Sequence, residues 1–137
     1  MKLQALSVLV LSAALWSGEA AIAQIPLQPG TYWLGTSKSI RIIGSENKFC
    51  YIGYSKYGVS IASLLPVLKQ PNVYRVHTFE GVLIMQQSDQ VLRFGKDQMW
   101  SDYQLDPSSS QDAIIPEGTL CLKSAKPYFK QFKPGRG

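Results

Sequence analysis

The chain has 137 residues, with 14 Lys and Arg, 9 Asp and Glu, and a formal net charge of +5. This length predicts one domain. Two cysteines and a single histidine exclude a four-ligand zinc site, and no segment carries the roughly 20 apolar residues that a membrane-spanning helix needs. We expect no cofactor, no metal ion, no nucleic-acid partner and no transmembrane segment in the mature chain.

The N-terminus has the three parts of a secretory signal peptide. Lys2 supplies a positive charge, residues 3–16 are almost uninterruptedly apolar, and Ala21 and Ala23 place small residues two apart. An uncleaved N-terminal anchor is the alternative. We expect a signal peptide over residues 1–23 that is cleaved near Ala23, which predicts an exported protein, either periplasmic or extracellular.

Short runs of β-branched, aromatic and aliphatic residues alternate with turn residues along 24–123, which predicts a single β domain. The expected strands are 31–34, 39–43, 48–54, 73–79, 82–87, 91–94, 99–103 and 119–123. The runs between 73 and 103 are typical of an antiparallel meander, and we expect this meander to be the core of the domain's stability. About seven to eight short strands predict an all-β fold, a small antiparallel barrel or sandwich.

Residues 59–70 do not fit the strand pattern clearly. Leu64, Leu65 and Leu68 lie at helical spacing, but Pro66 interrupts any long helix. We expect one short helical turn in this segment.

Cys50 and Cys121 are the two cysteines of the chain. An exported protein meets an oxidising compartment, in which a pair of thiols tends to close. We therefore predict a Cys50–Cys121 disulfide.

The composition changes after residue 123, and no acidic residue follows Glu117. The number of basic residues at this end equals the net charge of the whole chain. These residues are Lys123, Lys126, Lys130, Lys133 and Arg136. We expect residues 124–137 to form a basic, flexible C-terminal tail. Our hypothesis is that the tail binds an anionic surface, such as anionic lipid or an envelope polysaccharide. A solvated tail that binds nothing is the alternative.

Candidate catalytic residues are few. His77 is the only histidine, and its expected position in the middle of a strand, without an identified partner, favours a structural role. Four acids could pair for glycoside hydrolysis: Glu80, Asp89, Asp97 and Asp102. Three of them fall in expected turns, where acids are ordinary residues. We therefore predict no catalytic site and no enzyme activity.

The mature part is rich in aromatic residues for its size. Four of them are candidates for an exposed aromatic surface that could bind sugar or peptide: Trp33, Tyr54, Tyr57 and Trp100. Large aromatic side chains also fill the cores of small barrels. The alternative is therefore that these residues are core.

Two resemblances accompany these patterns. Residues 29–35, followed by 63–65 and 72–74, resemble small exported β-proteins of unknown function that are common in cyanobacteria, which implies no known activity. Ser88, the Arg93-Phe94 pair and Met99-Trp100 resemble the membrane-bound C-type lysozyme inhibitor family, whose members are small periplasmic β-barrels that block the lysozyme cleft. Asp102 stands where that family has its blocking lysine.

The leading hypothesis is an exported, non-enzymatic binding or accessory domain that contacts an anionic envelope surface. A periplasmic lysozyme-type inhibitor and a hydrolase that uses turn carboxylates are the alternatives.

Overall fold

The computed structural model describes residues 26–45, 47–56, 58–109 and 116–133. The expected signal peptide lies outside the described residues. Eight strands follow one another along the chain: β1 (Gly30–Leu34), β2 (Lys38–Ser45), β3 (Lys48–Ser55), β4 (Gly58–Val67), β5 (Gln70–Val76), β6 (Val82–Ser88), β7 (Val91–Lys96) and β8 (Met99–Leu105). Within this described part, no helix is long and apolar enough to cross a membrane.

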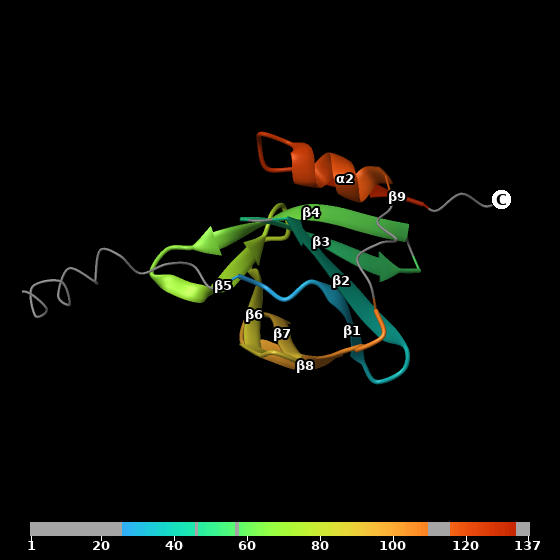
Figure 1. Ribbon diagram of the computed structural model, residues 1–137, viewed down its shortest axis with the longest axis vertical. Helices are drawn as coiled ribbons and strands as arrows, with labels where there is room; N and C mark the ends of the chain where they lie inside the picture. The colour runs from blue at the N-terminus through green and yellow to red at the C-terminus, as the bar shows by residue number, and fades with distance from the viewer. Residues whose placement is uncertain (1–25, 46, 57, 110–115, 134–137) are drawn as a thin grey trace, which may run out of the picture.

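Each strand pairs antiparallel with the next, and β8 pairs back with β1. The closing pairs are Tyr32 with Leu105 and Trp33 with Gln104. The eight strands therefore form a closed antiparallel barrel (Figure 1), which confirms the predicted all-β class and selects a barrel over a sandwich. Because the strands run alternately up and down, the connections 35–37, 77–81 and 97–98 lie at one end of the barrel. The turns 68–69 and 89–90 lie at the opposite end.

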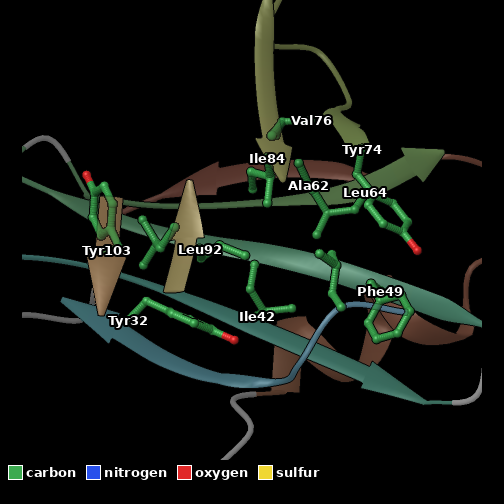
Figure 2. Packing of buried hydrophobic residues seen from close by; sticks show 12 residues of the cluster. Tyr32, Ile42, Phe49, Ala62, Leu64, Tyr74, Val76, Ile84, Leu92 and Tyr103 are labelled. Carbon is green, nitrogen blue, oxygen red and sulfur yellow. The ribbon is translucent and has the colours of Figure 1, made fainter. Parts of the chain in front are cut away.

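Apolar side chains fill the interior of the barrel, as expected for eight strands. Side chains from β1 to β8 and from the segment before β1 form this core: Leu27, Tyr32, Ile40, Ile42, Phe49, Ala62, Leu64, Tyr74, Val76, Ile84, Leu92 and Tyr103. Figure 2 shows ten of them labelled, directed from different strands into one shared space. Successive side chains of a strand point to opposite faces, so the residues between them face outward.

The expected helical turn in residues 59–70 is wrong, because residues 58–67 form strand β4. Val59 and Ile61 face outward, whereas Ala62 and Leu64 face the core, and all four side chains are buried. A strand buried on both faces carries a nearly continuous apolar run, which periodicity cannot distinguish from a helix. Pro66 lies at a register shift near the end of the strand, a place where proline is tolerated.

The expected strand 119–123 is wrong, because this segment belongs to helix α2 (Pro116–Lys123). Proline suits the first helical position, since the missing N–H would be unpaired there in any case. Glu117 in the first turn and Lys123 in the last turn complement the helix dipole. The helix covers the outer face of β2, β3 and β4 (Figure 1).

A second core lies beneath α2. Its buried members are Ile43, Cys50, Ile52, Val59, Ile61 and Cys121. The predicted disulfide is present between Cys50 and Cys121, with both cysteines fully buried and an S–S distance of 2.01 Å. The bridge therefore ties the helix to the barrel wall.

The described part of the C-terminal segment, 124–133, is not the expected flexible tail. It forms strand β9 (Phe129–Phe132), which pairs antiparallel with residues 59–62 of β4. The N–H of Tyr128 donates to Oγ of Ser63 at 2.8 Å, and Tyr128 and Phe132 pack on the second core. Burial of these aromatic residues stabilises the docked strand despite its basic composition. The last four residues, 134–137, lie outside the described part.

Candidate functional site

The aromatic candidates separate into different parts of the barrel. Trp33 on β1 and Trp100 on β8 both face outward on the same wall, which is formed by β1, β8 and β7. Tyr54, 49% exposed, lies on β3 and belongs to another wall. Tyr57 lies outside the described residues. The structure therefore brings two of the four candidates to one surface.

Trp100 lies against the backbone of the neighbouring strand. Its partner in the register with β7 is Gly95. A Cβ atom added to Gly95 would come within 2.9 Å of Cε3 of Trp100, so the absence of a side chain lets the indole pack on the sheet. The residue keeps 37% of its area exposed. Trp100 therefore leaves part of its large apolar side chain open to solvent.

Arg93 and Asp102 are register partners on the same wall, two positions along β7 and β8 from Gly95 and Trp100. Nε and Nη2 of Arg93 donate to the two carboxylate oxygens of Asp102 at 2.8 and 3.3 Å. The hydrogen bond from Arg93 holds the pKa of Asp102 below its ordinary value. The two side chains are 35% and 45% exposed, and an exposed pair of this kind contributes little to stability. Their remaining donors and acceptors are open to a ligand.

Trp33 lines a shallow groove at the far end of this wall. The groove has a volume of about 420 Å³, and Gln104, Leu105 and Asp106 line it with Trp33. Two hydrogen bonds from Ser108, with a smaller contribution from a hydrogen bond of Trp33, hold the pKa of Asp106 below its ordinary value. Asp106 therefore stays ionised at neutral pH beside Trp33 in the groove.

We call this face the outer-wall surface and define it by Trp33, Arg93, Trp100, Asp102 and Gln104. Residues 100, 102 and 104 alternate along β8, so their side chains form one row. With a strand rise of about 3.4 Å per residue, the row from Trp100 to Gln104 is about 14 Å long. The surface combines two indoles with a guanidinium, a carboxylate and an amide. The indoles can stack on a ligand, and the polar groups can form paired hydrogen bonds with it.

The basic candidates of the C-terminal segment do not gather at one place. Lys123, Lys126, Lys130 and Lys133 are all exposed. Lys126 lies with Asn47 at the end of the barrel opposite the 97–98 turn, whereas the backbone of Lys133 adjoins Gly58 at the other end. Arg136 lies outside the described residues. The charges are therefore spread along the length of the barrel, and their role in binding an anionic surface stays a prediction.

His77 was expected in the middle of a strand, and this was wrong. β5 ends at Val76, and His77 begins the loop to β6, in which Thr78 has a positive φ of 81°. The N–H of His77 donates to the carbonyl oxygen of Ser63 at 2.9 Å. The loop lines a cavity of about 440 Å³ together with the ends of β5 and β6.

The four candidate acids do not share one site. Glu80 and Asp97 lie in connections at one end of the barrel, and Asp89 lies in a turn at the opposite end. Asp102 lies on the outer wall with Arg93. Among the described residues, no group of three or more His, Cys, Asp or Glu is placed to hold a metal ion.

The residues that resemble the lysozyme inhibitor family lie on one sheet but at different heights. Ser88 ends β6 beside the 89–90 turn, whereas Trp100 lies near the start of β8 at the other end. Asp102, at the position of the family's lysine, is bonded to Arg93. This alternative function stays a prediction.

Gln104 was not among the residues singled out from the sequence, and Arg93 and Asp102 were not expected to share a surface with Trp33 and Trp100. The sequence does contain a pattern that indicates part of this surface. Alternation along the expected strand 99–103 places Trp100 and Asp102 on one face, and the same alternation extends to Gln104. The lateral neighbours Arg93 and Gly95 depend on the register between β7 and β8, which local sequence does not reveal. No protein-family model, no curated protein and no solved structure matches this chain.

Proposed function

We propose that this protein is a non-enzymatic binding domain that holds an envelope polysaccharide on its outer-wall surface. The observation that carries the proposal is the Trp100 ring, which lies on Gly95 and keeps an exposed area beside the Arg93–Asp102 pair. A pyranose ring presents a face of C–H groups that packs on an indole. Its neighbouring hydroxyls suit paired hydrogen bonds to a carboxylate or guanidinium.

The shape of the surface supports a chain-like ligand. Trp100 and the Trp33 groove lie at the two ends of a row about 14 Å long, and the polar side chains lie between them. A single sugar would reach one end of this row, whereas a short stretch of a polymer would reach both. A rigid strand scaffold also holds the side chains in place before the ligand arrives, which reduces the entropy lost on binding.

The location outside the cytoplasm is part of the proposal. The signal-peptide pattern in residues 1–23 and the Cys50–Cys121 disulfide support it, because disulfides persist in oxidising compartments. Lys123, Lys126, Lys130 and Lys133 are exposed in α2, β9 and the residues beside them, on a different wall. They would attract a part of an acidic polymer that extends beyond the outer-wall surface, and this attraction would weaken with salt.

The test is a titration with soluble neutral and acidic polysaccharides, followed by tryptophan fluorescence and affinity electrophoresis. Trp33 and Trp100 are the tryptophans of the described residues, so their emission reports on this surface. We expect Trp100→Ala to lower the affinity at least about tenfold, a change of about 1.4 kcal/mol. The matched control is Tyr54→Ala, which removes an exposed aromatic ring from another wall and should leave the affinity unchanged. Equal loss in both variants, or no binding by any polymer, would overturn the proposal.

A further inference from the structure

Two exposed lysines occupy inward-facing strand positions at the end of the barrel that carries the 35–37 and 97–98 turns. Lys38 precedes the core residues Ile40 and Ile42 on alternate positions of β2, and Lys96 follows Leu92 and Phe94 in the same way on β7. Interior positions of a small barrel are ordinarily apolar. A lysine at such a position either extends past the rim into water or binds something at the rim.

Both lysines line one cavity, which we call the mouth. Its volume is about 340 Å³, at the small end of the roughly 300–1,000 Å³ that ligand pockets occupy. Its lining includes Leu34, Lys38, Phe94, Lys96, Met99 and Tyr103. The mouth therefore combines two cationic groups with an apolar wall.

The floor of the mouth is a set of packed aromatic rings. Phe94 stacks on Tyr51 with ring centroids 5.9 Å apart and meets Tyr103 edge to face at 5.8 Å. Burial, with a smaller contribution from Tyr103, raises the pKa of Tyr51 to about 12, and burial raises the pKa of Tyr103. Both phenols therefore stay neutral, and the floor adds no negative charge.

The apolar wall is open to solvent at Met99, which is 78% exposed. Met99 pairs with Lys96 across the 97–98 turn. Asp97 and Gln98 in this turn have φ values of 51° and 69°, a left-handed conformation that ordinarily favours Asn and Gly. Strain of this kind is often found at binding sites. The tight turn fixes the spacing of the lysine and the methionine at the rim.

The charges of the mouth are not balanced within it. Among the described residues, no carboxylate lies within 4.0 Å of the ammonium group of Lys38 or Lys96. Asp97 also lines the cavity, so the two lysines leave an excess of one positive charge. Charge complementarity therefore favours an anionic ligand with an apolar body.

We propose that the mouth binds a small organic carboxylate, with its carboxylate on Lys38 and Lys96 and its apolar body against Phe94. The unbranched, flexible Met99 side chain would cover that body and adapt to its shape. This site is separate from the outer-wall surface, and the proposal does not rest on the proposed function.

The test uses 3-phenylpropionate and octanoate as probes, with 3-phenylpropionamide as the neutral counterpart. Binding is followed by calorimetry and by backbone amide shifts in NMR. We expect the two acids to bind and to shift the amides of residues 34, 96 and 101, and the amide probe to bind at least about tenfold more weakly, because it lacks the charge-assisted bond.

Two double variants of equal charge change complete the experiment. Lys38→Gln with Lys96→Gln should lower the affinity for both acids at least about tenfold, whereas Lys123→Gln with Lys126→Gln, far from the mouth, should not change it. Equal binding of acid and amide, equal loss in both double variants, or no saturation below about 10 mM would overturn the proposal. Trp100→Ala should keep carboxylate binding, so failure of the polysaccharide proposal is distinguishable from failure of this one.

Discussion

Gly95 and Trp100 are register partners on β7 and β8, and the glycine provides the space that the indole occupies. A Cβ at position 95 would lie 2.9 Å from Cε3 of Trp100 and 2.5 Å from the carbonyl oxygen of Met99. Both distances are shorter than a side chain tolerates without displacing its neighbours. The exposed tryptophan thus depends on one specific glycine.

Gly95→Ala should therefore lower the free energy of unfolding by about 1–3 kcal/mol, which is the usual cost of inserting an extra carbon atom into a closely packed site. Urea denaturation measures the change. In a Trp100→Ala background the cost should fall by at least about 0.5 kcal/mol, because the indole part of the clash is gone. An undiminished cost would show that the Met99 backbone alone is responsible.

Ile84 lies in the barrel core with no exposed surface. Ile84→Ala should lower the free energy of unfolding by about 2–4 kcal/mol, through lost transfer energy and the remaining cavity. Val76, 1% exposed, should respond in the same direction. The matched control is Leu68→Ala, because Leu68 has a similar volume but is 87% exposed; it should change stability by less than about 0.5 kcal/mol. Equal thermal melts for Ile84→Ala and Leu68→Ala would contradict the assignment of the core.

Cys50 and Cys121 are 71 residues apart in sequence. The loop-entropy argument predicts that replacing both by Ala lowers the free energy of unfolding by about 4 kcal/mol. Denaturation of the oxidised protein and of the double variant measures the difference. The reduced wild-type protein should resemble the double variant. Two reactive thiols in the folded, unreduced protein would refute the bridge.

The raised pKa of Tyr51 predicts that the free energy of unfolding falls at alkaline pH. Its pKa is raised from 10.0 to about 12, mainly by burial, so the folded state keeps its proton to a higher pH than the unfolded state. The contribution of Tyr51 to the free energy of unfolding is complete below about pH 10 and is lost as the pH rises towards about 12. Tyr51→Phe should make this fall shallower, although burial of Tyr32 and Tyr103 leaves part of it.

Tyr54→Phe is the control for this pH dependence. It removes a hydroxyl from the same strand, but from a side chain that is half exposed. Urea denaturation at several pH values between 9 and 12 compares the variants. The same slope in the wild type and in Tyr51→Phe would show that burial of this phenol does not control alkaline stability.

Seven of the expected strands correspond to strands of the barrel, because alternation and turn residues are local signals. The pattern failed where burial on both faces made β4 continuously apolar and where Pro116 began a helix instead of a strand. The disulfide was predicted because the chain has two cysteines and was expected to enter an oxidising compartment. The two aromatic residues of the outer-wall surface were identified from residue type, but their common wall was not.

The amino-acid sequence by itself determined the strand class, most strand positions, the crosslink and the excess of basic residues, since each depends on neighbours along the chain or on composition. Only the tertiary structure decided that β8 closes on β1, that β9 docks on β4, and that Lys38 and Lys96 both line the mouth. These features depend on pairing between segments far apart in the sequence. The register of such pairs is set by the shared burial of both strands, which no local pattern contains.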